Sequence, residues 1–281
     1  MIEIPFIVLL ILTGVLAGFL AGLLGIGGGV VLVPALYYTQ KYAEAAQADI
    51  SLMHISVGTS LAIIIPTAIS SALAHWKKGG VDLDMLSRLS LGVLVGAAFG
   101  VVMAGFLSGE NLKLIFAIAI SLLAIYMIMS PDTHQVFTKR PKALASGLAG
   151  GGGIGVISVL IGIGGATLSV PLMRLYGLKM SRAIGTASAL GLIISFPGTI
   201  GFTTLGALQT DIQTTSPFVL GYINWLAWLI IVPASAAMAP VGAGVTHKLP
   251  TRRLKHIFSG LMILVSLKMM SETIDLGIAF W

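Results

Sequence analysis

The sequence contains two copies of one glycine-rich stretch, each inside a long apolar segment. The first copy reads LLGIGGGVVLVP from Leu23, and the second reads LIGIGGATLSVP from Leu160. Glycine costs about 1 kcal/mol relative to alanine in the interior of a helix. Two matched glycine clusters therefore predict two matched helix breaks.

The segments around the breaks are hydrophobic enough to lie in a membrane. The chain has 281 residues, of which 57% are hydrophobic and 9% charged, and its mean hydropathy is +1.02. Soluble domains carry roughly 25% charged residues, and a helix needs about 20 apolar residues to cross a bilayer. We therefore expect an all-α polytopic membrane protein. The apolar segments are 5–38, 53–74, 85–107, 112–130, 143–176, 183–205, 217–246 and 254–270.

The two segments that hold the breaks, 5–38 and 143–176, are too long for one span and too short for two spans and a turn. Each predicts a helical hairpin, in which a helix breaks at the glycines and a shorter helix returns to the same side. All but three of the 16 Lys and Arg residues lie in four loops. These are Lys77, Lys78, Arg88, Lys139, Arg140, Lys142, Arg174, Lys179, Arg182, Lys248, Arg252, Arg253 and Lys255.

Basic loops of membrane proteins face the cytoplasm, and this rule fixes the expected topology. Each half then makes one broken hairpin and three crossings, about ten helical segments in all, and the halves have opposite orientation. We expect an N-terminal repeat at 1–135, an inverted C-terminal repeat at 136–281, and both termini outside. A second matched pair supports the repeat, since SVGTSLA at 56–62 is answered by AIGTASA at 183–189. Inverted repeats that share helix breaks favour a secondary transporter.

Three stretches, GIGGGVVLVPAL, VGTSLA and HWKKGGVD, resemble the TauE/SafE family of sulfite exporters. The resemblance covers nearly the whole chain. It implies a transporter of sulfite or a small organosulfur anion such as a sulfonate, in a prokaryotic plasma (inner) membrane. The second half has ATLS at 166–169 where the first half has GVVL, so the resemblance does not imply a symmetric site, and it does not fix the substrate.

The breaks predict an anion site, because a helix N-terminus leaves backbone N–H groups unpaired and carries a partial positive charge. Threonine and serine hydroxyls near the breaks would complete it. His54 and His75 are further candidates, and His75, beside Trp76, is expected at the membrane interface. The candidate substrate-binding residues are Gly25, Gly27, Gly28, Gly29, Thr59, Ser60, Gly162, Gly164, Gly165, Thr167, Thr186 and Ser188. The glycines spaced by four at 14, 18 and 22, and at 92, 96 and 100, are expected to allow close helix packing instead.

No Asp or Glu falls in the middle of an expected span, although proton-driven pumps usually use carboxylate relays. An anion that leaves a negative-inside cell gains about 2.3 kcal/mol per charge per 100 mV, so the sequence favours electrogenic export. A passive anion channel, an uptake permease for a related organic anion, and a receptor or scaffold stay open as alternatives.

Other function classes find no support in the sequence. The chain has no cysteine, no H-E-x-x-H motif and no rhomboid-type G-x-S-G motif, so we expect no enzyme, no metal site and no cofactor. Cytoplasmic loops account for the net charge of +6 without nucleic acid. The expected partners are a small anionic sulfur-containing substrate and the lipid bilayer, and homodimerisation is left open.

Overall fold

The computed structural model describes residues 4–25, 27–43, 52–129, 146–209, 218–245 and 251–274. This part of the chain is helical apart from one antiparallel pair of two-residue strands, so the all-α prediction is confirmed. The elements are α1 Ile4–Leu24, α2 Gly29–Ala43, α3 Leu52–Trp76, α4 Leu83–Phe106, α5 Gly109–Met129, α6 Ser146–Leu160, α7 Ala166–Leu175, α8 Met180–Leu208, β1 Val219–Leu220, β2 Ile223–Asn224, α9 Trp225–Val245 and α10 Thr251–Ile274.

Six of the described helices are long and apolar enough to cross a membrane, which makes this a multi-pass membrane protein. They are α1, α3, α4, α5, α8 and α9. Helices α2 and α7, which follow the breaks, have only 15 and 10 residues. Helix α10 was also expected to cross the membrane, and it has 24 residues.

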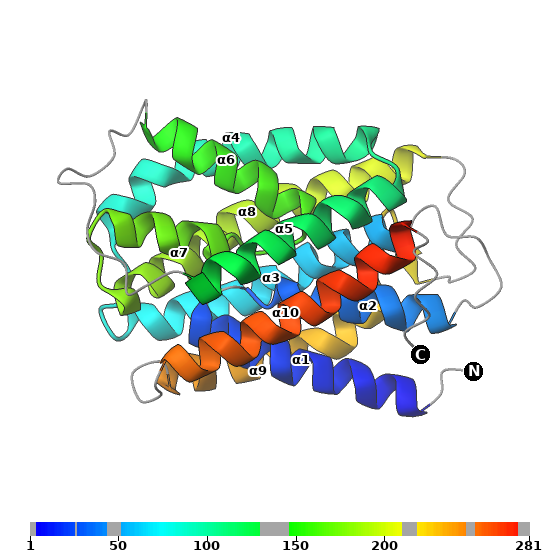
Figure 1. Ribbon diagram of the computed structural model, residues 1–281, viewed down its shortest axis with the longest axis horizontal. Helices are drawn as coiled ribbons and strands as arrows, with labels where there is room; N and C mark the ends of the chain where they lie inside the picture. Colours follow the sequence, from blue (N-terminus) through cyan, green and yellow to red (C-terminus); the bar gives the residue numbers. More distant parts are fainter. Residues whose placement is uncertain are drawn as a thin grey trace.

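The helices lie along the long axis of one bundle (Figure 1). Helix α1 begins and α10 ends at the same end of the bundle, whereas α5 ends and α6 begins at the opposite end. Helix α2 runs back to the end where α1 began, and α7 runs back to the end where α6 began. The two long helices α3 and α8 pack against each other between these hairpins.

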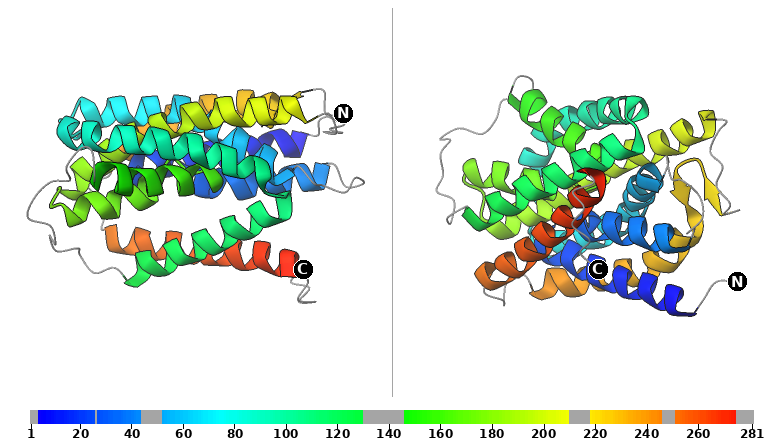
Figure 2. Two further views of the ribbon diagram at one scale, coloured as in Figure 1. Left: turned by 90° about the horizontal axis from the view of Figure 1, so that it is seen from above. Right: turned by 45° about the vertical axis from the view of Figure 1, so that its right-hand side comes forward.

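The packing follows one pattern in both halves of the chain. Helix α1 packs against α9 and α6 against α4, α3 packs against α9 and α8 against α4, and α5 packs against α10 (Figure 2). Exchanging α1 to α5 for α6 to α10 in order leaves this set of pairs unchanged. Each hairpin therefore has its main partner in the other half of the chain.

Small residues allow the closest of these contacts, as the glycine spacing predicted. A Cβ added at Gly18 on α1 would lie 2.1 Å from the backbone oxygen of Ser235 on α9. A Cβ added at Gly96 on α4 would lie 2.1 Å from the backbone oxygen of Gly152 on α6. Side chains at either position would separate the helix pair.

Both predicted helix breaks are confirmed. Helix α1 ends at Leu24 and α2 begins at Gly29, and α6 ends at Leu160 and α7 begins at Ala166. The residues before the two returning helices, Gly28 and Gly165, both have φ 76°. This left-handed conformation disfavours residues with a side chain, so the two breaks require glycine at matching positions.

Candidate functional site

The two helix breaks meet in the centre of the bundle. A Cβ added at Gly27 in the first break would lie 3.1 Å from the Cα of Gly164 in the second break. The sequence places glycine at both positions, which allows the two backbones to come this close. The contact brings together two stretches that are far apart in the chain.

Each break also rests on the long helix of the other half. A Cβ at Gly25 would lie 2.8 Å from the backbone oxygen of Ile184 on α8, and a Cβ at Gly162 would lie 3.2 Å from the Cα of Val57 on α3. Val57 and Ile184 occupy the same place in the matched stretches SVGTSLA and AIGTASA. The two breaks therefore make equivalent contacts.

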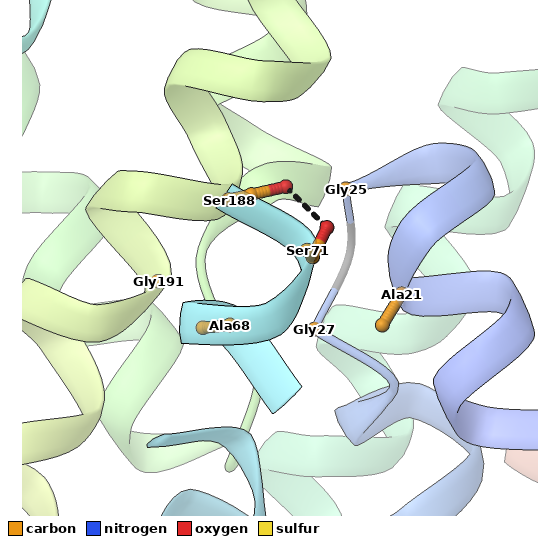
Figure 3. A pocket seen from close by; sticks show the side chains of 7 residues that line it. All are labelled: Ala21, Gly25, Gly27, Ala68, Ser71, Ser188 and Gly191. Atoms are coloured by element: carbon orange, nitrogen blue, oxygen red, sulfur yellow. Dashed lines mark hydrogen bonds between the residues drawn. The ribbon is translucent and has the colours of Figure 1, made fainter. Parts of the chain in front are cut away.

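A tight gap lies beside the first break, and we call it the break pocket (Figure 3). It has no room for a water molecule. Its lining residues are Ala21, Gly25, Gly27, Ala68, Ser71, Ser188 and Gly191.

Two serine hydroxyls supply the polar side chains of the break pocket. The Oγ atoms of Ser71 on α3 and Ser188 on α8 point toward each other, 3.0 Å apart (Figure 3). Ser188 also donates a hydrogen bond to the backbone oxygen of Ile184 at 3.1 Å. Because a hydroxyl has one proton, Ser71 donates to Ser188, and Ser71 is the hydroxyl that could rotate to donate to a bound acceptor.

The corresponding space at the second break is filled. The matched stretches place Leu61 where the other half has Ser188, and Ile64 where it has Gly191. The Cδ1 atom of Leu61 would lie 2.8 Å from a Cβ added at Gly198 on α8. The paired hydroxyls therefore lie at the first break, and the matching place at the second break has an apolar contact.

The second break has unsatisfied hydroxyls of its own. Thr167 Oγ1, Ser158 Oγ and Ser169 Oγ are buried and have no hydrogen-bond partner among the described residues. The Oγ of Ser158 lies 3.3 Å from the position of a Cβ at Gly165, the N-cap of α7. A buried hydroxyl without a partner costs about 1–3 kcal/mol, so these groups could donate to an acceptor at this helix N-terminus.

Two of the predicted ligands, Thr59 and Thr186, hold helix caps. Thr59 Oγ1 accepts a hydrogen bond from the backbone N–H of Asn224 at 2.9 Å, and Thr186 Oγ1 accepts one from the backbone N–H of Asp82 at 2.9 Å. Asn224 caps α9 through its Oδ1 and the N–H of Ala227, and Asp82 caps α4 in the same way. Each threonine thus forms a hydrogen bond with the N-cap residue of a helix in the other half of the chain.

Ser60 and the two histidines also lie outside the break pocket lining. Ser60 donates to the backbone oxygen of Gly162 at 2.8 Å, so it supports the second break. His54 Nε2 lies 3.2 Å from the backbone oxygen of Ala104. His75 lies in the last turn of α3, and its buried ring bonds to the backbone oxygen of Gly22 at 3.0 Å.

His54 stacks on Tyr222 in the turn between β1 and β2, with ring centroids 4.9 Å apart. Burial raises the pKa of Tyr222, so its phenol stays protonated and donates to the Oε1 of Gln209. His54 is therefore packed in an aromatic contact at the end of the bundle where α3 begins.

Of the predicted site residues, Gly25, Gly27 and Ser188 line the break pocket, and Gly164 adjoins it through Gly27. Gly28 and Gly29 belong to the first break, but they face the backbones of α1 and the second break. The other lining residues, Ala21, Ala68, Ser71 and Gly191, were not predicted. Their signal was small residues three positions apart on one helix face, at 68 and 71 on α3 and at 188 and 191 on α8.

The site offers backbone and hydroxyl groups and no metal-ligating cluster. Within the described ranges, no three His, Asp or Glu side chains gather closely enough to hold a metal ion. Such a set of neutral hydrogen-bond donors suits an anion better than a cation.

Comparisons with known proteins agree with a membrane transporter. The family model described as "Sulfite exporter TauE/SafE" matches residues 10–269. A "Probable membrane transporter protein" from Haemophilus influenzae is 36% identical over 264 residues, which cover 94% of this chain and 98% of the relative. The "Probable membrane transporter protein YunE" from Bacillus subtilis is 26% identical and covers 95% of this chain and 98% of its own length.

A further relative, from Methanocaldococcus jannaschii, is also described as a probable membrane transporter and is 25% identical over 93% of this chain and 94% of its own. No solved structure matches the chain. With a family match that spans nearly all the helices, and with relatives that cover the chain end to end, this protein belongs to the TauE/SafE family of membrane transporters and is not an enzyme.

Proposed function

We propose that the protein exports a small sulfur-containing oxyanion, such as sulfite or a sulfonate, by alternating access around the two helix breaks. The family description names sulfite exporters. One structural observation carries the proposal: Gly27 and Gly164 bring the two breaks into contact beside the paired hydroxyls of Ser71 and Ser188. This is a compact set of donors at the centre of the bundle.

The proposal includes an inverted repeat, with residues 1–135 as one unit and 136–281 as the other. The exchangeable packing pairs and the opposite directions of the two hairpins support it. The basic residues of the described loops, such as Lys77 and Lys179, lie at the end where α5 ends. With this end in the cytoplasm, both termini face outside, and the prokaryotic relatives support a plasma (inner) membrane location.

Binding would rest on dipoles and hydroxyls, without a neutralising charge in the site. The first turns of α2 and α7 present backbone N–H groups, and each helix end carries about half a positive charge. The break pocket is closed to water, so an anion would enter only when the surrounding helices move apart. That requirement supports a carrier over a continuously open channel.

The test is a substrate panel with purified protein in proteoliposomes. Efflux of sulfite, sulfate, sulfoacetate and thiosulfate would be compared with efflux of acetate, which lacks sulfur. We expect saturable efflux of at least one sulfur oxyanion. Efflux that stays linear with concentration and gives single-channel currents would identify a channel, and binding without flux would identify a receptor.

A matched pair of variants links the flux to the break pocket. Ser188→Leu introduces the residue that fills the corresponding space in the other half, and it should abolish efflux. Gly153→Leu adds the same side chain on α6 where a Cβ would meet nothing within 4 Å, and it should leave efflux unchanged. Equal efflux from the two variants would contradict the proposed site.

A further inference from the structure

Helices α2 and α10 end, and α5 begins, at the same end of the bundle (Figure 1), and each of the three helices carries a lysine there that contacts a tyrosine of α2. The three lysines are Lys41 on α2, Lys113 on α5 and Lys268 on α10, and together with Tyr37 and Tyr38 we call them the three-lysine cluster. They are also the three Lys and Arg residues that do not belong to the four basic loops. Among the described residues, the positive side chains of this end of the bundle are therefore concentrated in one place.

The aromatic side chains of α2 hold the cluster together. The Nζ of Lys113 lies 3.5 Å from the hydroxyl oxygen of Tyr37 and 5.7 Å from the centroid of its ring. The Nζ of Lys41 lies 5.9 Å from the same centroid. The Nζ of Lys268 lies 4.5 Å from the ring centroid of Tyr38. These cation–π contacts stabilise the ammonium groups only in part.

Among the described residues, two nearby carboxylates, Glu272 and Glu110, face the three lysines of the cluster. Glu272 forms an ion pair with Lys41 at 2.8 Å, and Glu110, one turn before Lys113, is exposed. Neither Lys113 nor Lys268 forms an ion pair with another described residue. Lys113 is only 7% exposed, and a buried ammonium group without a paired anion is costly.

The other unsatisfied groups here are hydrogen-bond donors. Gln40 Nε2, on the turn of α2 between Tyr37 and Lys41, is buried and bonds to no described residue. The buried hydroxyl of Tyr38 forms no well-aligned hydrogen bond to a described residue, although the Glu272 carboxylate lies near enough to accept a weak one from it. Within the part of the chain that the structure describes, charged and neutral donors outnumber the acceptors here, which is the character of an oxyanion site.

We propose that the three-lysine cluster is a second anion-binding site, separate from the break pocket, that takes a sulfate-, sulfonate- or phosphate-like oxyanion. Lys113 and Lys268 would hold the charge, while Gln40 and Tyr38 donate the neutral hydrogen bonds. Neither α5 nor α10 contributes to the break pocket. A free anion and the phosphate of a lipid headgroup share this chemistry, so the test has an arm for each.

The test measures thermal unfolding of the full chain in nanodiscs. In the first arm the lipid is phosphatidylcholine, and sodium sulfate replaces sodium gluconate at constant ionic strength. In the second arm phosphatidylglycerol replaces phosphatidylcholine without sulfate. A ligand that binds only the folded state raises the midpoint of unfolding. We expect an increase in at least one arm, and the arm that shows it identifies the source of the oxyanion.

Variants assign the increase to the cluster. Lys113→Met and Lys268→Met remove one charge each at similar side-chain length, and both should lose the increase. Lys77→Met removes a charge from an exposed lysine at the opposite end of the bundle, and it should keep the increase. Lys268 is only partly buried, so its variant decides the question even if Lys113→Met does not fold.

A Ser188→Leu background separates this site from the break pocket. The increase should persist in Ser188→Leu and disappear when Lys268→Met is added. Normal transport by Ser188→Leu would contradict the proposed function. The rise in the unfolding midpoint would still test the three-lysine cluster, because that measurement does not depend on transport. The second site is overturned if neither arm raises the midpoint, if Lys268→Met keeps the increase, or if Lys77→Met loses it as fully.

Discussion

Removing either hydroxyl of the break pocket should weaken substrate binding while leaving the protein folded. Ser71→Ala and Ser188→Ala each delete one oxygen from a buried pair and leave the helix backbone unchanged. In the closed structure Ser71 donates to Ser188, and Ser188 donates to the backbone oxygen of Ile184. With substrate bound, we expect both hydroxyls to take part in holding an oxyanion.

The expected size of the effect follows from these bonds. A hydrogen bond to a charged group contributes about 1.5–3 kcal/mol, and 1.4 kcal/mol corresponds to a tenfold change in affinity. Each variant should therefore raise KM by about tenfold to a hundredfold. For stability, Ser71→Ala removes one neutral bond, about 1 kcal/mol. Ser188→Ala costs more, because it leaves the Ser71 hydroxyl buried without its partner.

The assay is the concentration dependence of efflux from proteoliposomes, with two serines outside the break pocket as controls. Ser56 on α3 and Ser195 on α8 are fully buried, and each bonds to the carbonyl four residues before it. Ser56→Ala and Ser195→Ala should leave KM within twofold of the unchanged protein. If Ser71→Ala and Ser188→Ala behave like these controls, the hydroxyls do not bind substrate and the site is misplaced.

Three further outcomes are expected. Single cysteines at Lys179 and Leu208, the two ends of the 29-residue helix α8, should react with impermeant reagents from opposite sides of the membrane, and labelling from one side would contradict the topology. A negative-inside potential should speed efflux more than a pH gradient imposed at zero potential, and His54→Ala should keep this order; concentrative transport driven by pH alone and lost in His54→Ala would show proton coupling instead. Gly18→Leu should abolish folded protein in detergent, because a Cβ there would lie 2.1 Å from a backbone oxygen of α9, whereas Gly153→Ala, which meets nothing, should raise stability by up to about 1 kcal/mol; equal melting of the two would refute the packing role.

The sequence was sufficient to predict the helical class, both breaks and the close helix contacts. Glycines 14, 18 and 22 lie on one face of α1 because residues four apart share a face, and they do contact α9. The β1–β2 pair was not predicted, since its four paired residues are too few to give a periodic signal. The inverted repeat and the site of transport stay predictions, and homodimerisation stays open.

The candidate site was less predictable, because side-chain roles depend on partners from distant segments. Thr59 and Thr186 follow matched glycines in the sequence, which made them candidate substrate ligands. In the structure their hydroxyl oxygens accept hydrogen bonds from the N-cap residues Asn224 and Asp82 instead. No local pattern reveals such partners. The same limit applies to Gly28→Leu and Gly165→Leu, which look like simple tests of an anion site from the sequence. Both positions have φ 76°, so loss of transport there would report backbone strain as well as lost binding.

The reciprocal contacts between the halves have a consequence for how the protein matures. Helix α1 is synthesised first, but the helix that covers its glycines, α9, is among the last to be made. The N-cap residue of α4, Asp82, likewise gains its hydrogen bond to Thr186 only after α8 is made, and Thr59 gains its hydrogen bond from Asn224 only after β2 is made. A nascent chain that stops after α5 therefore has inserted helices whose small-residue faces lack their packing partners and whose caps lack their hydrogen bonds. We expect membrane proteases to degrade such a chain. The helices therefore reach their final packing only after the whole polypeptide has been made, in a step that follows insertion into the membrane.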